Sequence, residues 1–172
     1  MEKITRILVM SDTHGLRQDE VTKIIENEHC DYNIHCGDYC YDLAYMQKYF
    51  NYFVLGNNDH KYADEQYTIK FEIAGFKFYL LHGNQLAWHP YKTWLKSLFV
   101  KASHENVDVL LFGHSHSYLV TTNKEHIIIA NPGSVTMGRH GRSSYMIITI
   151  RNREINFEKR IPNFSEQKDK QL

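Results

Sequence analysis

Short polar motifs stand directly behind the apolar runs of this chain, and this repeated order constrains the fold more than any other feature. The apolar runs are short and bounded by turn residues, as buried strands are. In open α/β sheets, ligands collect at the carboxyl ends of the strands, and every motif lies at such an end. The motifs are Asp12-Thr13-His14, Gly37-Asp38, Gly56-Asn57-Asn58-Asp59, His82-Gly83 and Gly113-His114-Ser115-His116.

Strands and helices alternate in the first half of the chain. Strand patterns at 6–12, 32–36 and 52–55 are separated by helix patterns at 17–28 and 43–49. Because helices cross between consecutive strands, these three strands are expected to be parallel.

The second half is mostly strand. Turn residues predict hairpins around Ala74-Gly75, 123–125 and 151–153, while the segment after Pro90 is the strongest helix pattern and 108–112 is another buried strand. This order predicts an α/β fold of two stacked mixed β-sheets flanked by helices. One long mixed sheet is the alternative.

Length and charge limit the classes of protein to consider. A chain of 172 residues predicts a single domain, here 1–164, followed by a frayed polar tail at 165–172. Lys plus Arg equals Asp plus Glu at 20 each, so bulk charge points neither to a nucleic-acid track nor to a membrane surface. Three cysteines without an apolar leader segment predict a cytoplasmic protein with reduced thiols.

Each motif alone is also typical of an ordinary turn, because Gly, Asn and Asp dominate turns. The joint pattern is far more specific than its parts, since all motifs fall at the same end of their strands. A carboxylate such as Asp38 has two oxygens and can bridge two cations roughly 3.5–4 Å apart. Nitrogen and oxygen donors without thiolate suit Mn²⁺, Fe²⁺, Co²⁺, Ni²⁺ or Zn²⁺ rather than Ca²⁺.

The order D-x-H, G-D, G-N-x-D, H-G and G-H-x-H, followed by N-P-G-S at 131–134, resembles the calcineurin-like metallophosphoesterase superfamily. Within it, the chain is most similar to the small bacterial and archaeal phosphodiesterases. The motifs span Asp12 to Ser134, which is most of the chain. The resemblance implies a four-layer αββα sandwich and two divalent metal ions, with Mn²⁺ the favoured activator.

The resemblance also implies a ligand set for each ion, with Asp38 shared between them. The first ion would be held by Asp12, His14, Asp38 and His116. The second would be held by Asp38, Asn57, His82 and His114.

The chain departs from the larger family members at two positions. Those members carry G-N-H-E and G-D-x-x-D-R, whose histidine and second aspartate assist the leaving group; here Asn58 replaces the histidine and the aspartate spacing is broken. Asp38 and Asn58 are the candidate catalytic residues. Arg139 and His140 are candidate contacts to substrate phosphate, with a solvated loop as the equally weighted alternative.

The expected activity is that of a metal-dependent phosphoesterase, most simply a phosphodiesterase of small phosphate esters. Two cations would generate hydroxide from a bound water, and the hydroxide would attack phosphorus in line with the leaving oxygen. The alternatives are a non-catalytic protein-binding scaffold of the same fold and, third, a nuclease. Exposed hairpin edges leave room for a homo-oligomer.

Overall fold

The computed structural model describes residues 3–61, 65–86, 90–138 and 142–164. The predicted phosphate contacts Arg139 and His140 lie outside these ranges, and so does the polar tail at 165–172.

The first sheet contains the N-terminal strands and the C-terminal hairpin. Its order is β10-β9-β1-β2-β3. Both β1–β2 and β2–β3 are parallel, as the alternation of strand and helix predicted, while β9 is antiparallel to β1 and β10. The strands are β1 (Thr5–Met10), β2 (Tyr32–His35), β3 (Tyr52–Phe53), β9 (Tyr145–Arg151) and β10 (Glu154–Arg160).

The second sheet is built from the middle of the chain, in the order β4-β5-β6-β8-β7. Its central strands β5, β6 and β8 are parallel, and the hairpin partners β4 and β7 flank them. The strands are β4 (Thr68–Ile73), β5 (Phe76–Leu81), β6 (Val109–Leu111), β7 (Tyr118–Thr122) and β8 (Ile128–Pro132). The presence of two separate sheets excludes the alternative of one long mixed sheet.

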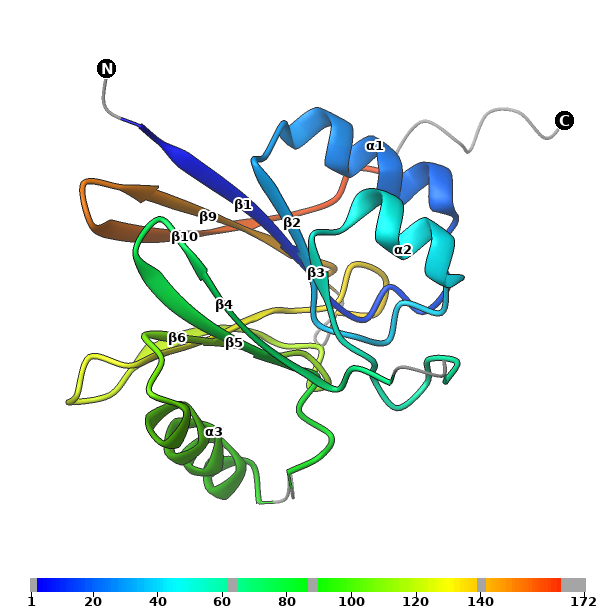
Figure 1. Cartoon of the computed structure of the whole chain (residues 1–172). Helices are drawn as coiled ribbons and strands as arrows, with labels where there is room; N and C mark the ends of the chain where they lie inside the picture. The colour runs from blue at the N-terminus through cyan, green and yellow to red at the C-terminus, as the bar shows by residue number, and fades with distance from the viewer. Residues whose placement is uncertain (1–2, 62–64, 87–89, 139–141, 165–172) are drawn as a thin grey trace, which may run out of the picture.

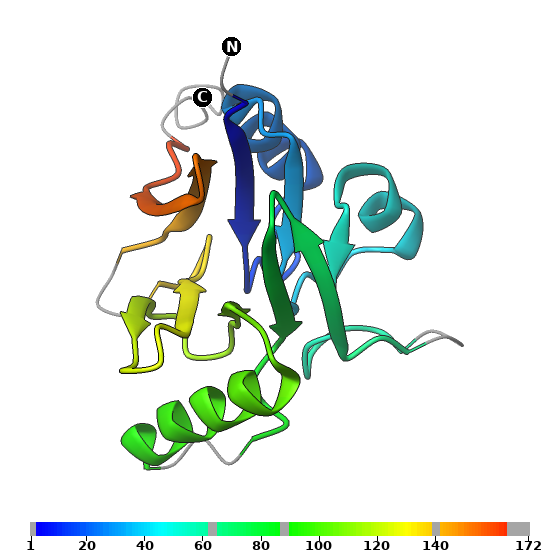
Figure 2. The ribbon, with the colours of Figure 1, turned by 60° about the vertical axis from the view of Figure 1, so that its left-hand side comes forward.

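Helices cover the outer faces of both sheets, as Figures 1 and 2 show. The helices α1 (Gln18–Glu28) and α2 (Leu43–Tyr49) pack on the first sheet, and α3 (Tyr91–Glu105) packs on the second. The Asp42 side chain caps α2 by accepting a hydrogen bond from the backbone N–H of Tyr45. The layers are therefore helix, sheet, sheet and helix, as predicted. Among the described residues, no helix has the length and apolar character that a membrane span requires.

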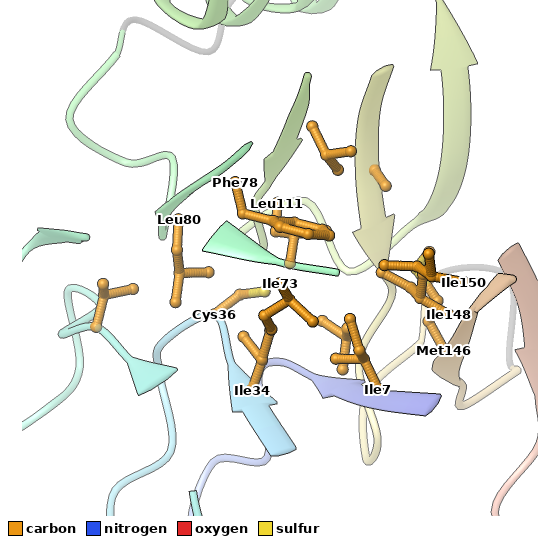
Figure 3. Close-up of a cluster of buried hydrophobic side chains, with 14 residues drawn as sticks. Ile7, Ile34, Cys36, Ile73, Phe78, Leu80, Leu111, Met146, Ile148 and Ile150 are labelled. Carbon is orange, nitrogen blue, oxygen red and sulfur yellow. The ribbon is translucent and has the colours of Figure 1, made fainter. Parts of the chain in front are cut away.

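The space between the sheets is filled by apolar side chains from both (Figure 3). Successive residues of β1 alternate between the two faces of its sheet: Ile7 and Val9 pack toward the second sheet, whereas Leu8 and Met10 pack toward the helices. Burying each such side chain contributes about 1.5–3 kcal/mol. Because both faces of β1 are buried, its carboxyl end is held rigidly in the middle of the fold.

Several strands end earlier than the sequence predicted: β1 ends at Met10 within the pattern at 6–12, β2 at His35 within 32–36, and β6 at Leu111 within 108–112. The strand expected at 52–55 is β3, which ends at Phe53, because the backbone N–H of Leu55 donates to the carbonyl oxygen of Gln66 over 2.8 Å and the chain leaves the sheet. Strand β8, which follows the hairpin turn predicted around 123–125, begins at Ile128 and continues to Pro132. Proline is tolerated there because it ends the strand.

Candidate metal centre

The candidate site lies where the loops after β1 and β2 run side by side. The backbone N–H of Asp12 donates to the carbonyl oxygen of Gly37 over 3.0 Å, and that of His14 donates to the carbonyl oxygen of Asp38 over 2.9 Å. Parallel pairing of the two strands thus continues into their loops. This pairing brings the buried carboxylates of Asp12 and Asp38 together.

The loops after β5 and β6 reach the same place from the second sheet. The backbone N–H of Gly113 donates to the carbonyl oxygen of His82 over 2.9 Å, which joins these two loops. The backbone N–H of His114 then donates to Oδ2 of Asp12 over 3.1 Å, and the Ser11 hydroxyl donates to the same oxygen. The carboxylate of Asp12 is therefore a point where the two sheets meet.

Five of the predicted metal ligands have a positive backbone φ angle, which L-residues rarely adopt. Such conformations cost about 1–3 kcal/mol each and cluster at functional sites. They bend the loops sharply, so that residues two apart in the chain, such as His114 and His116, can face one site. The five are Asp12 (53°), His14 (44°), Asp38 (55°), His114 (65°) and His116 (56°).

Gly56 and Gly113 allow neighbouring loops to approach the carboxylates closely. A Cβ atom on Gly56 would lie 2.1 Å from Oδ1 of Asp38. One on Gly113 would lie 2.1 Å from the Ser11 hydroxyl oxygen and 2.8 Å from Oδ2 of Asp12. Side chains do not fit at either position, so these motif glycines are required by contact with the site.

Asp12, His14 and His116 form one group of converging ligand atoms. The Nε2 atom of His116 lies 3.1 Å from Oδ1 of Asp12, and Nε2 of His14 lies 3.7 Å from the same oxygen. The two Nε2 atoms lie 3.2 Å apart. The three ligand atoms all fall within 4.8 Å of one another, a spacing that suits a single ion.

Asp12, Asp38 and His82 form a second, fully buried group. The Nε2 atom of His82 lies 3.4 Å from Oδ2 of Asp38 and 3.9 Å from Oδ1 of Asp12. Oδ2 of Asp38 also lies 3.9 Å from Nε2 of His14, in the first group. Asp12 is therefore the member common to both groups, whereas Asp38, predicted to be the shared ligand, belongs to the second group and lies near the first.

Backbone carbonyl groups orient two of the imidazoles. Nδ1 of His82 donates to the carbonyl oxygen of Cys36 over 2.8 Å, and Nδ1 of His116 donates to that of Met137 over 3.1 Å. A hydrogen bond from one ring nitrogen leaves the lone pair of the other available to a metal. In both residues the Nε2 atom faces the carboxylates.

The donor atoms fit divalent metal ions. Among the described residues, Oδ1 of Asp12 and Nε2 of His82 are buried side-chain atoms without a hydrogen-bond partner. An unsatisfied buried polar atom costs about 1–3 kcal/mol, and such cases call for an explanation. Coordination to divalent cations would satisfy both atoms, and the N and O donor set is suited to first-row transition metals.

Electrostatics favour a cation at this position. Burial opposes ionisation of Asp38, but His82 and the N–H groups of Asn58 hold its pKa well below the ordinary value. Burial likewise opposes ionisation of Asp12, and contacts with His116, His82 and Ser11 keep its pKa low. Two ionised carboxylates in a buried site attract positive charge. The pKa of His82 shows the same effect: burial lowers it, but the neighbouring Asp38 and Asp12 raise it above the ordinary value.

The asparagine next to Asp38 is Asn58. Its backbone N–H donates to Oδ1 of Asp38 over 2.8 Å, and its side-chain Nδ2 donates to Oδ2 over 2.7 Å. Asn57, the predicted amide ligand, is exposed and lines a cavity of about 210 Å³ beside the site, together with Lys61 and Asn84. The structure thus brings the candidate catalytic residue Asn58 into direct contact with the carboxylate of Asp38.

His114 lies at the edge of the second group. Its ring meets that of His82 edge-on, with the centroids 5.2 Å apart, and faces the ring of Trp94 at 6.5 Å. Burial is the main cause that lowers the pKa of His114, and the neighbouring His82 lowers it further. A neutral imidazole is the form that binds a metal.

The Asn131-Pro132-Gly133-Ser134 segment supports the loops that carry the site. Nδ2 of Asn131 donates to the carbonyl oxygen of Gly113 over 2.8 Å and to the Ser115 hydroxyl over 3.1 Å. The Ser134 hydroxyl donates to the carbonyl oxygen of Asp12 over 2.8 Å. The segment therefore fixes the loops of both sheets without contributing a ligand.

His35 lies in the core beside the site, and Ser11 supports the site through a role that sequence reasoning missed. His35 is fully buried; its Nδ1 accepts from the backbone N–H of Gly37, and its Nε2 lies 3.1 Å from the Thr13 hydroxyl. Burial lowers its pKa to about 3. Ser11 carries no recognisable signal beyond its place directly before Asp12.

Comparison with known proteins agrees with this architecture. Residues 5–153 match the model of the calcineurin-like phosphoesterase superfamily domain, and the chain belongs to that superfamily. It is 35% identical over 139 residues to a probable metallophosphoesterase of Mycoplasma pneumoniae, an alignment that covers 81% of this chain and 84% of the relative.

Solved structures share the fold at low sequence identity. A protein of Streptococcus pneumoniae TIGR4 described as a predicted phosphoesterase superposes with a TM-score of 0.78 at 23% identity, covering 94% of this chain and 92% of the other. An archaeal phosphodiesterase gives 0.68 at 21% identity, covering 91% and 99%. Vacuolar protein sorting 29 of Cryptosporidium parvum gives 0.69 at 16% identity, covering 91% and 97%.

Proposed function

We propose that the protein is a metal-dependent phosphodiesterase that hydrolyses small phosphate esters with two divalent ions, Mn²⁺ being favoured. The observation that carries the proposal is the convergence of ligand atoms from two sheets, contributed by Asp12, His14, Asp38, His82 and His116. Two of these atoms, Oδ1 of Asp12 and Nε2 of His82, are buried without a hydrogen-bond partner. Membership in the superfamily and the likeness to an archaeal phosphodiesterase support it.

The two groups of converging donors contain five of the seven predicted ligands, and Asn57 and His114 belong to neither group. Asp12, His14, Asp38 and His116 would hold one ion, and Asp38, Asn57, His82 and His114 the other. When bound, divalent ions supply the acidity that ionises water near neutral pH and the charge that offsets the phosphate oxygens. The protein holds the carboxylates ionised and the imidazoles oriented, so attack on phosphorus in line with the leaving oxygen needs no rearrangement of the donors.

Asn58 determines which esters react best. Its side-chain amide lies next to Asp38, where larger superfamily members place a histidine. An amide donates a hydrogen bond to a phosphate oxygen but does not protonate a leaving group. Esters with good leaving groups are therefore the preferred substrates, and the rate should fall as the leaving-group pKa rises.

The alternative function is a non-catalytic scaffold of the same fold, which the likeness to vacuolar protein sorting 29 favours. A scaffold has no need to orient imidazole Nε2 atoms toward ionised carboxylates. The hydrogen bonds from His82 and His116 to backbone carbonyl groups therefore favour the enzyme.

The test is hydrolysis of an activated aryl phosphodiester by chelator-treated protein, with and without added Mn²⁺, and with aryl monoesters in parallel. We expect Mn²⁺-dependent turnover that is faster with the diester and absent in Asp38→Asn. Asp108→Asn is a matched control, because Asp108 accepts a hydrogen bond from the backbone N–H of Lys77, a residue outside the site. Equal inactivity with and without Mn²⁺ would favour the scaffold.

A further inference from the structure

Asp59 is bonded to the loop that presents Asp38. Its Oδ2 accepts hydrogen bonds from the backbone N–H groups of Asp38, over 2.7 Å, and Gly56, over 2.8 Å. Its Oδ1 accepts from the backbone N–H of Cys40 over 2.7 Å. The half-buried carboxylate of Asp59 thus accepts hydrogen bonds from three N–H groups, which belong to the loops after β2 and β3.

The loop that Asp59 holds has an unfavourable backbone conformation. Gly37, Asp38 and Cys40 have φ angles of 97°, 55° and 59°. The two non-glycine residues cost of the order of 1–3 kcal/mol each, and such a conformation persists only when surrounding contacts impose it. The N–H groups of Asp38 and Cys40 point to one place, and successive N–H groups arranged in this way form a concave site for an anion. The carboxylate of Asp59 is the anion that fills it.

Asp59 also fixes the loop on its other side. The Gly56 N–H that it accepts belongs to the residue whose Cα faces Asp38, and Asn58 lies next to Asp59 in the chain. The contacts of Asn58 with both oxygens of Asp38 therefore depend on the same carboxylate. Asp59 itself accepts N–H groups and belongs to neither group of converging ligand atoms.

We infer that Asp59 is a positioning residue: its carboxylate, seated among the N–H groups of Asp38, Cys40 and Gly56, sets the orientation of Asp38 and through it the affinity of the site for metal. This inference rests on the proposed function. It adds a residue that acts on the site entirely through the backbone.

The test measures Mn²⁺ binding by calorimetry in Asp59→Asn, with Asp108→Asn as the control that removes a carboxylate acceptor elsewhere. Each variant is compared with the original protein at a temperature where circular dichroism shows it folded. We expect Asp59→Asn to bind Mn²⁺ roughly 10- to 100-fold more weakly, the usual effect of removing an outer-shell partner of a ligand, and Asp108→Asn to bind normally. The kcat for the aryl diester should fall in Asp59→Asn with little change in KM.

Chemical rescue separates positioning from general stability. Asp59 lines the cavity of about 210 Å³, so a small carboxylate can reach the place that Asp59→Ala vacates. Formate should restore Mn²⁺ affinity and kcat to Asp59→Ala and give no gain to the original protein or to Asp108→Ala. Rescue is scored only with folded Asp59→Ala; otherwise Asp59→Asn decides.

The inference is overturned if Asp59→Asn binds Mn²⁺ as tightly as the original protein and loses only thermal stability. A different result would count against the proposed function itself: failure of the original protein to bind Mn²⁺ or to hydrolyse the diester. The two failures appear in different proteins and are therefore distinguishable.

Discussion

The Nε2 atoms of His14 and His116 lie 3.2 Å apart, although the two residues are separated by 102 positions in the chain. Two imidazole lone pairs do not approach so closely unless a proton or a cation lies between them. Oδ1 of Asp12 lies 3.1 Å from one ring and 3.7 Å from the other, which supplies the negative charge that a cation needs.

Replacing His116 tests this group of donors. His116→Gln should weaken Mn²⁺ binding by at least tenfold and reduce kcat/KM by a larger factor, because the loss of a ligand exceeds the 10- to 100-fold cost of losing its support. The measurements are calorimetric titration and diester hydrolysis. His104→Gln is the control, since the His104 side chain is 79% exposed. Equal Mn²⁺ affinity in the two variants would exclude His116 as a ligand.

Gly56→Ala should abolish diester hydrolysis, because the added methyl group would clash with the carboxylate of Asp38. The added methyl group would lie 2.1 Å from Oδ1 of Asp38, so the carboxylate or the loop must move. Gly75→Ala places a methyl group in open space at a φ of 83°, and it should cost about 1 kcal/mol of stability with full activity. Assays of kcat/KM and urea unfolding distinguish the two effects. An active Gly56→Ala would show that Asp38 can move without loss of function.

Asn131→Ala should destabilise the fold by about 2–4 kcal/mol, because it leaves buried partners on the Gly113 and Ser115 loop unsatisfied. Asn123 likewise makes two side-chain hydrogen bonds, which its Oδ1 accepts from the backbone N–H groups of Glu125 and Ile127, but it lies in a hairpin turn at the surface. Asn123→Ala should therefore cost about 0.5–1.5 kcal/mol. Urea unfolding of the metal-free proteins gives both values, and equal costs would contradict the supporting role of Asn131.

Buried His35 should make stability depend on pH. Its folded pKa of about 3 lies below the ordinary 6.5, so protons bind preferentially to the unfolded chain. The stabilising contribution is complete above about pH 6.5 and is lost, by up to about 1.4 kcal/mol per pH unit, as the pH falls toward 3. The advantage of the original protein over His35→Gln in urea unfolding should shrink between pH 7 and pH 5. Parallel curves for the two proteins would refute this.

Much of the site is predictable from sequence because the end of a buried strand can be recognised from the pattern of residue types. A polar residue directly after a buried strand, such as Asp12 or Asp38, must lie at the edge of the sheet. The layers were also predictable, because a strand such as β1 with apolar side chains on both faces must be covered on both sides.

The remaining features depend on backbone geometry that a pattern of residue types does not contain. Asn57 and Asn58 are identical in type, and only the direction of the turn decides which amide meets Asp38. The role of Asp59 depends on three N–H groups, which every non-proline residue possesses. Arg139 and His140 lie outside the described residues, so their contact with substrate stays a prediction.

The central position of β1 has a consequence for synthesis of the protein. One of its two neighbours, β9, begins at Tyr145, and the Ser134 hydroxyl anchors the carbonyl group of Asp12. A nascent chain that has emerged only as far as α3 already carries both carboxylates, but it lacks the strand that pairs with the second edge of β1 and the hydroxyl that donates to the carbonyl group of Asp12. During synthesis, the complete set of contacts around the centre can therefore form only after the segment around residues 134–150 has left the ribosome.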